Sequence, residues 1–262
     1  MKIKRYQVDA FTNKLFAGNP AAVCVIEKPI PDALMQAIAA ENNLSETAFV
    51  WGGQGEYEIC WFTPLCEVDL CGHATLASAH ALIAEEGVSE NVIRFKSRSR
   101  GNLIVTQRGL FYELDFPRAG FARQGEDRSL MGCVSEPPVE FWSANEDLLV
   151  VYSDADSVSR LQVDSGRLGE LKYRALIATS TGDDCDFVSR FFAPALGINE
   201  DAVTGSAHTV LAPFWSDRLK KKKMKARQLS QRGGELTCEL VGERVLISGE
   251  AVTYSTGTIL ID

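Results

Sequence analysis

The segment EVDLCGHATLASAHAL, residues 67–82, joins a strand-like stretch to an alanine-rich helix through a Cys-Gly-His step. The preceding residues, YEICWF at 57–62, are of types typical of a strand, and the small apolar residues after Gly72 predict a helix. A glycine at a helix start leaves the first backbone N–H groups open at the positive end of the helix dipole. The thiol of Cys71 and the imidazole of His73 therefore flank a candidate anion site.

A second segment, EDAVTGSAHTVLAPFW at residues 200–215, repeats this pattern. Both segments place Glu five residues before a glycine, then a small polar residue or histidine, then Ala, and each opens an apolar helix of similar length. Because both are surrounded by hairpin-like strands, the repeat predicts two duplicated α+β halves. Two such helix N-termini directed into one cleft would form paired anion sites suited to a small carboxylate.

The domain boundary is expected near Pro117, where the strand pattern breaks. Residues 117–132, PRAGFARQGEDRSLMG, are polar and rich in glycine, which predicts a linker. We therefore expect an N-terminal domain over residues 1–116 and a C-terminal domain over residues 117–250.

Composition excludes several classes of protein. The 262 residues are 45% hydrophobic and carry a net charge of −8, which argues against nucleic acid or an anionic membrane as the main partner. No apolar run reaches the roughly 20 residues of a membrane span, and the N-terminus does not read as a signal peptide. Seven cysteines without CxxC pairs argue against a disulfide framework and a zinc module, and suit a reducing compartment. We expect a soluble, cytoplasmic protein.

Three polar positions in the first half are candidates for chemistry. Glu46, in NNLSETAFV, is either an acid/base catalyst or a surface residue at a strand end. Cys71 is either a nucleophile or base, since a helix N-terminus favours the thiolate, or a small buried apolar side chain. His73 is either a hydrogen-bonded structural residue or a neutral imidazole that can donate or accept a proton.

The second half offers NEDAVTGSAH, residues 199–208. Asp201 and Thr204 precede the glycine, and Ser206 lies on the first helical turn. The alternative here is an ordinary helix whose first turn is capped by Thr204 or Asp201. The chain has no phosphate-binding loop, no G-x-G-x-x-G and no G-x-S-x-G motif, which disfavours nucleotide-dependent enzymes and serine hydrolases.

Four motifs in order resemble the phenazine-biosynthesis-like (PhzF-like) family of isomerases, which is related in fold to diaminopimelate epimerase. They are VDAFTNKLFAGNPAAV, NNLSETAFV, the segment at 67–82 and RFFAPALGINEDAVTGSAHTVLAPFW, and the resemblance spans essentially the whole chain. It implies an α+β fold of two duplicated, pseudo-symmetric domains, each a barrel-like, mostly antiparallel sheet around a central helix. The active site would lie in the cleft between the domains, and a C-terminal strand at about 251–262 would return to the first domain.

The resemblance also assigns roles to individual residues. The catalytic set that it implies is Glu46 as general acid/base, with His73, Asp201 and Ser206. The substrate-binding set that it implies is Asn19, Cys71, Gly72, Thr204 and Gly205. It further implies that the enzyme uses no metal and no organic cofactor, and that it forms a homodimer.

The expected reaction is an isomerisation in which one carboxylate moves a proton on a small carboxylate-bearing metabolite. Related racemases use two cysteines, one before each cleft glycine, whereas this chain has Cys71 in the first position and Thr204 in the second. A symmetric two-thiol racemase is therefore disfavoured. Two alternatives stay open: an epimerase or dehydratase of a small amino or hydroxy acid with Cys71 as base, and a non-catalytic protein that binds a small acid.

Overall fold

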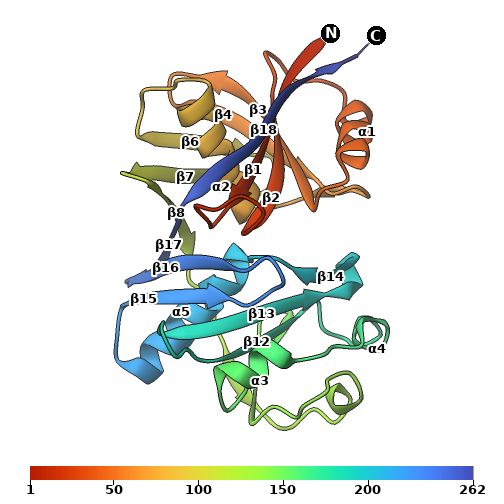
Figure 1. Ribbon diagram of the computed structural model, residues 1–262, viewed down its shortest axis with the longest axis vertical. Coiled ribbons are helices and arrows are strands. Elements are labelled where there is room, and N and C mark those ends of the chain that lie inside the picture. Colours follow the sequence, from red (N-terminus) through yellow and green to blue (C-terminus); the bar gives the residue numbers. More distant parts are fainter. Residues whose placement is uncertain (262) are drawn as a thin grey trace. The chain divides into compact units, whose positions relative to one another are not determined.

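The computed structural model describes residues 1–261 and divides the chain into two compact units. The first unit contains residues 1–115 together with the C-terminal segment that begins at Ser248, and the second contains Phe116–Ile247. Figure 1 shows the two chain ends side by side in the first unit, where β18 (Ala251–Leu260) pairs antiparallel with β1 (Lys2–Ala10). The C-terminal strand is therefore part of the N-terminal unit.

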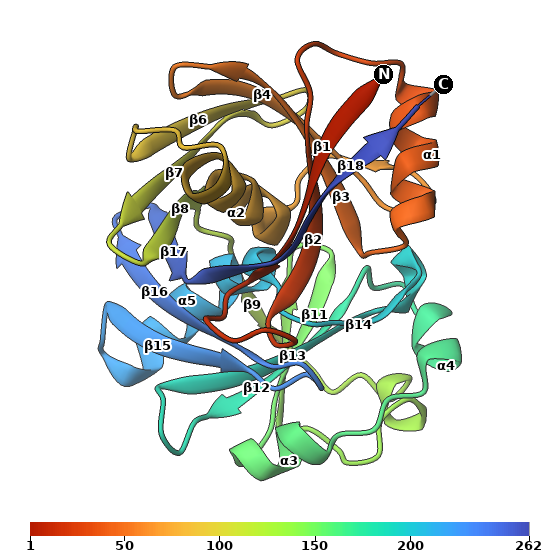
Figure 2. The same cartoon turned by 45° about the horizontal axis from the view of Figure 1, so that its top comes forward.

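The first unit is built of strands around one buried helix. Its other elements are β2 (Asn19–Val25), α1 (Asp32–Asn42), β3 (Glu46–Gly53), β4 (Glu56–Phe62), β5 (Glu67–Val68), α2 (Gly72–His80), a π-helical turn (Ala81–Glu85), β6 (Val92–Ser97), β7 (Gly101–Arg108) and β8 (Phe111–Pro117). Helix α2 is made of small residues and is almost wholly buried, so strands can approach it from several sides. Figure 2 shows α2 enclosed by the strands of this unit. The helix predicted to run from Gly72 to about Glu86 thus ends in a π-helical turn.

The second unit has a similar composition of elements. They are β9 (Ala122–Gln124), a 3₁₀ turn (Leu130–Gly132), β10 (Glu140–Ala144), β11 (Asp147–Val151), α3 (Ala155–Arg160), α4 (Ser165–Gly169), β12 (Leu176–Thr181), β13 (Phe187–Ala193), a 3₁₀ turn (Pro194–Leu196), β14 (Ile198–Asp201), α5 (Gly205–Leu219), β15 (Lys223–Gln228), β16 (Gly234–Val241) and β17 (Arg244–Gly249). Its core includes Leu148, Val150 and Leu176 on adjacent strands.

Strand pairing within each unit follows the same sequence. In the first, β1–β2 is antiparallel, β2–β3 parallel, β3–β4 and β4–β5 antiparallel, β4–β6 parallel and β6–β7 antiparallel. In the second, β10–β11, β11–β12, β12–β13, β13–β14, β13–β15 and β15–β16 repeat these six relations in order. Each parallel pair is joined by a helical crossover, as parallel strands require. The predicted α+β fold of duplicated halves is confirmed.

The prediction that residues 117–132 form a linker is partly wrong. Within residues 117–132, Arg123 of β9 pairs with Trp142 of β10, and Leu130 is completely buried in the core of the second unit. The sequence did not indicate that Leu130 is buried, because a single apolar residue among polar and glycine residues has no periodicity to detect. One such side chain is nevertheless enough to anchor a short turn in the core.

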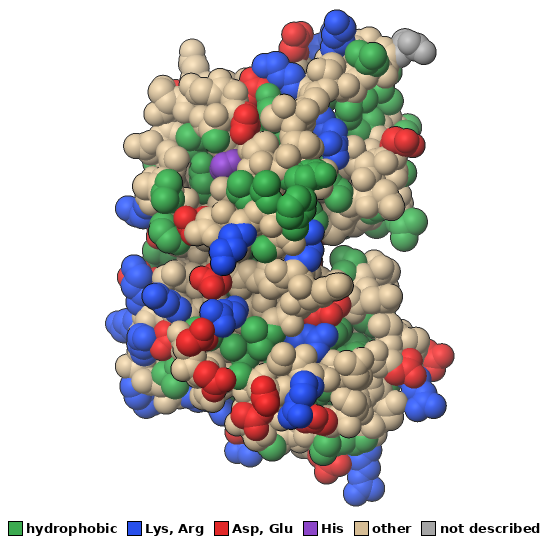
Figure 3. Space-filling view, in the orientation of Figure 1, with side chains coloured by type: hydrophobic (Ala, Val, Ile, Leu, Met, Phe, Trp, Pro, Cys, Tyr) green, Lys and Arg blue, Asp and Glu red, His purple; other side chains and the backbone are tan. Residues whose placement is uncertain are grey.

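The surface drawn in Figure 3 carries Lys and Arg side chains interspersed with Asp and Glu. Among the exposed apolar side chains, Phe16 and Tyr254, 68% and 47% exposed, have ring centroids 5.7 Å apart. No helix in the described part of the chain, residues 1–261, is long and apolar enough to cross a membrane.

Candidate active site

Glu46 is the first residue of β3 and is held in place by the sheet. It pairs with Ala21 in the parallel ladder with β2, and the apolar residues that follow it lie in the core. The Glu46 residue is only 9% exposed, so the surface position considered from the sequence is wrong. Burial raises the pKa of the Glu46 carboxyl, and hydrogen bonds from Ser45 and Cys71 partly oppose this increase.

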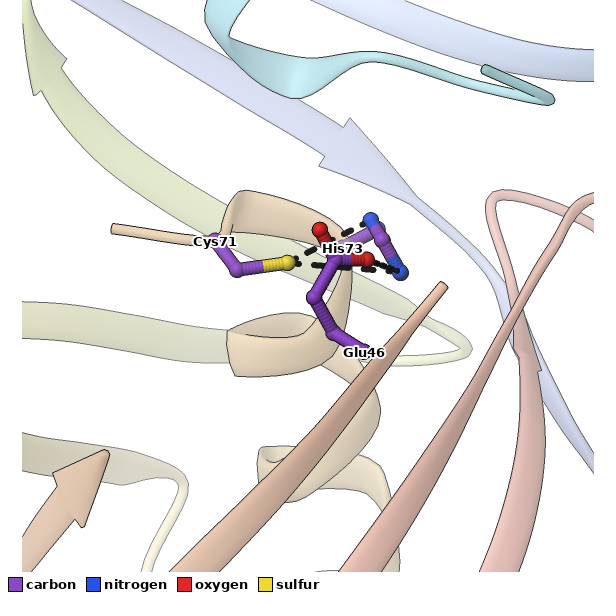
Figure 4. Close-up of side chains that lie close together, drawn as sticks. All are labelled: Glu46, Cys71 and His73. Atoms are coloured by element: carbon purple, nitrogen blue, oxygen red, sulfur yellow. Dashed lines mark hydrogen bonds and ion pairs between the residues drawn. The ribbon is translucent and has the colours of Figure 1, made fainter. Parts of the chain in front are cut away.

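His73 lies on the first turn of α2 beside this carboxyl group. His73 Nε2 is 3.2 Å from Glu46 Oε2, and the imidazole is buried with 4% of the residue exposed. Glu46 Oε2 nevertheless makes no hydrogen bond to any described residue. Figure 4 shows the side chains of Glu46, Cys71 and His73 converging at the start of the helix. A buried oxygen without a hydrogen bond is costly, and such atoms are concentrated where a ligand or a reaction uses them.

The tautomer of His73 follows from its contact with Asn19. Asn19 Nδ2 lies 3.1 Å from His73 Nδ1, so an amide N–H donates to that nitrogen. The Ser45 hydroxyl also lies 3.4 Å from His73 Nε2. Because Nδ1 accepts from Asn19, the proton of the neutral imidazole is on Nε2, the nitrogen that faces Glu46. Asn19 therefore positions His73, in addition to the substrate-binding role that the family resemblance implies.

Gly18 sets the position of Asn19. It has φ of +65°, and an added Cβ would lie 2.2 Å from the carbonyl oxygen of Ala10. We expect Gly18→Ala to reduce the free energy of unfolding by more than about 2 kcal/mol, because a left-handed backbone and a backbone clash add together. Gly109→Ala is the matched control, since Gly109 has φ of +64° with nothing within 4 Å of its Cβ position. Urea unfolding of both variants measures the difference, and equal losses would contradict the clash.

Cys71 is the N-cap residue of α2, but its side chain does not cap the helix. Its Sγ lies 3.5 Å from His73 Nδ1, and the residue is buried. Neither sequence alternative describes this thiol fully, because it is buried yet faces polar groups. The Glu46 carboxylate, the Cys71 thiol and the His73 imidazole each offer one ligand atom, and the three atoms lie within 4.8 Å of one another. They are the residues of this site that can hold a metal ion.

In the second unit, a compact hydrogen-bond cluster lies at the start of α5. Thr204 Oγ1 donates to Asp201 Oδ2 at 2.5 Å, so the threonine in the second cysteine position is bound to a carboxylate. Gln228 of β15 is completely buried; its Oε1 accepts from Thr204 N at 2.8 Å, and its Nε2 donates to Asp201 O at 2.7 Å. Ser206 is exposed on the first turn of the helix. Sequence reasoning missed Gln228, which stands in a plain strand pattern 24 residues beyond Thr204.

The two glycine-started helices differ from α3 and α4 in their first turns. Asp154 and Asp164 cap α3 and α4 by accepting from backbone N–H groups of the first turn. Neither Cys71 at α2 nor Thr204 at α5 makes such a bond. Of the two caps considered for residues 199–208, Thr204 is therefore excluded, and at both helices the N-cap side chain leaves the first backbone N–H groups to other partners.

The carboxylate is present in one unit only. In the antiparallel ladders, Thr47 is the first paired residue of β3 and Leu176 is the first of β12. Since the pairing order of the two units is the same, the residues just before them, Glu46 and Ala175, are equivalent. The duplicated fold therefore carries a carboxylate at this position in the first unit and an alanine in the second.

His208 connects the cluster in the second unit with the core. Its Nδ1 donates to Thr204 O at 2.8 Å, and its ring centroid lies 5.9 Å from that of Phe187. Complete burial lowers the pKa of His208 from 6.5 to about 4. Neutral His208 is favoured in the folded state, so its stability contribution is complete above pH 6.5 and is lost as the pH falls towards 4.

We expect this loss to reach about 3 kcal/mol below pH 4. His208→Gln retains a donor to Thr204 O but does not titrate. The wild-type protein should lose stability relative to this variant between pH 7 and pH 4.5 in urea unfolding followed by tryptophan fluorescence. A stability difference that stays constant with pH would contradict the assignment.

A model of the phenazine biosynthesis-like (PhzC-PhzF) proteins matches residues 8–257. The chain belongs to this family. It is 46% identical over 259 residues to an uncharacterized isomerase of Pseudomonas aeruginosa, with 99% of each chain covered. It superposes on the crystal structure of a PhzF-family protein from Enterococcus faecalis with a TM-score of 0.96 and 44% identity, covering 100% of both chains.

The likeness in fold extends to epimerases. The structure of a predicted epimerase from Pseudomonas aeruginosa matches with a TM-score of 0.77 at 20% identity, covering 99% of this chain and 100% of that one, which shows the fold alone. Relatives of this chain within the family are named isomerases. The prediction of an isomerase of the PhzF-like family with an epimerase-like fold is confirmed at the level of the enzyme class.

Proposed function

We propose that this PhzF-family isomerase moves a proton between carbon atoms of a small carboxylate-bearing metabolite, with Glu46 as the general acid/base. The observation that carries the proposal is the buried Oε2 of Glu46, which makes no hydrogen bond within residues 1–261 although His73 Nε2 lies 3.2 Å away. A carboxylate in such surroundings is more basic than one in water, so it can remove a proton from carbon next to a carbonyl or carboxylate group and return it elsewhere.

The electrons left on the substrate need stabilisation while the proton is on Glu46. Asn19 keeps the His73 proton on Nε2, so that His73 can donate to a developing enolate oxygen as a neutral imidazole. The uncapped N-terminus of α2 supplies backbone N–H groups and a positive dipole for the same charge. General acid/base catalysis typically accelerates a reaction by about 10²–10⁴-fold, and the rest of the rate acceleration must come from such charge stabilisation.

We further propose that Asp201, Ser206 and the uncapped N-terminus of α5 bind the same substrate. Support comes from the family resemblance and from the identical order of pairing in the two units, which makes the starts of α2 and α5 equivalent. Because Ala175 replaces the carboxylate in the second unit, this half would bind the substrate but would not abstract its proton. Homodimer formation, implied by the family, stays a prediction that light scattering after size-exclusion chromatography checks.

The deciding experiment is incubation with a metabolite extract in heavy water, followed by mass spectrometry. The expected result is one or a few small acids that gain deuterium at carbon with the wild-type protein and not with Glu46→Gln. If no acid exchanges a carbon-bound proton while one is retained by the protein in equilibrium dialysis, the small-acid-binding alternative replaces this proposal.

A second candidate function, an epimerase or dehydratase with Cys71 as base, is favoured by one observation. Cys71 Sγ lies 3.5 Å from His73 Nδ1, so the imidazole could take up the thiol proton. In that mechanism, Cys71→Ser would abolish deuterium incorporation. The same variant should retain most of the activity if Glu46 is the base.

A further inference from the structure

We propose that Glu46, Cys71 and His73 form a reversible, inhibitory binding site for Zn²⁺. The binding needs only the first unit, whereas its effect on catalysis rests on the proposed function. The three donors are a carboxylate, a thiol and an imidazole, all of which are zinc ligands in proteins. The spacing of cysteines in the sequence indicated no zinc module, since only the fold brings these side chains together.

The distances suit a tetrahedral ion. With bond lengths of about 2.0 to 2.3 Å, neighbouring ligand atoms around zinc lie about 3.3 to 3.6 Å apart. His73 Nε2 lies 3.2 Å from Glu46 Oε2 and 4.0 Å from Cys71 Sγ, and all three ligand atoms lie within 4.8 Å. Small side-chain rotations would bring the set into range. Three protein ligands leave a fourth position for water, as in zinc sites that exchange ligands.

The charges also balance. Zinc binding would displace the proton of the Cys71 thiol, so that a thiolate and the Glu46 carboxylate neutralise the divalent ion. A neutral set of this kind is favourable in a buried site, where an unpaired charge is costly. The bound ion occupies Glu46 Oε2 and the facing nitrogen of His73, and so it blocks the proton transfer proposed above.

The surroundings allow the required tautomer of His73. Coordination through Nε2 moves the ring proton to Nδ1, which then needs an acceptor. Asn19 lies 3.1 Å away, and a half turn of its amide presents the carbonyl oxygen instead of the N–H. An acceptor behind a metal-bound histidine is the usual second contact in zinc sites, and its loss typically weakens binding by about 10–100-fold.

The test is a titration of the tag-free, metal-free protein with Co²⁺, followed by displacement with Zn²⁺. We expect one equivalent of Co²⁺ with the charge-transfer absorption of a cobalt–thiolate bond, and loss of that band on adding Zn²⁺. Cys71→Ser and His73→Gln should bind each ion at least about tenfold more weakly. Cys66→Ser and Cys185→Ser, which alter an exposed and a partly exposed thiol, are the controls that should bind normally.

Binding without the thiolate band, or binding unchanged in Cys71→Ser, would overturn the inference. The outcomes also separate it from the proposed function. If the protein exchanges deuterium in the presence of a chelator but binds no Co²⁺, the proposed function is supported and the metal site is rejected. If the protein binds Co²⁺ through Cys71 but exchanges no deuterium, the metal site is supported and the proposed function is rejected.

Discussion

Glu46→Gln should lower the rate of solvent-deuterium incorporation by about 10²–10⁴-fold, the range typical for loss of a general acid/base. The glutamine has nearly the same shape and can still accept hydrogen bonds from Ser45 and Cys71, so its packing in β3 is preserved. It cannot, however, take up a proton at a useful pKa. The measurement is the initial rate of deuterium gain by the identified acid, followed by mass spectrometry.

Cys71→Ser is the matched variant for this prediction, because Cys71 lies in the same cluster and is equally buried. It should change the rate by less than about tenfold, the effect of an altered hydrogen bond to the carboxylate. Tryptophan fluorescence of both variants checks that the fold is retained. If Cys71→Ser were inactive and Glu46→Gln active, the thiol would be the base and the epimerase or dehydratase alternative would hold.

The dependence of kcat/KM on pH gives the second large effect. Glu46 must be ionised to remove a proton, and its pKa is raised by burial above the ordinary 4.5. We therefore expect kcat/KM to fall about tenfold for each pH unit below this raised pKa. The acidic limb of the profile should lie above the pH at which an exposed glutamate titrates.

Ser45→Ala tests the assignment of that limb. The hydrogen bond from Ser45 lowers the pKa of Glu46, so its removal should raise the pKa further and move the limb to higher pH. The rate at high pH should change less than the rate near neutrality. A limb that stays in place, or moves to lower pH, would show that another group controls the reaction.

Much of the fold could be predicted because local patterns repeat. The glycine-started helices at Gly72 and Gly205 and the strands beside them are regular enough to indicate two duplicated α+β halves. The π-helical turn after His80 and the buried side chain of Leu130 were not predicted, since neither has a periodic signal. Both depend on what the rest of the unit packs against them.

For the candidate site, the sequence by itself determined the residue types and their order: a lone glutamate after Ser45, a Cys-Gly-His step and its Thr-Gly-Ser counterpart. Only the tertiary structure decided that Glu46 is buried, that Asn19 orients His73 and that Gln228 holds Thr204. The physical reason is that hydrogen bonds and desolvation act between residues 24 to 54 positions apart, where no local pattern constrains them. Local chemistry sets what each side chain can do, whereas folding decides which groups surround it.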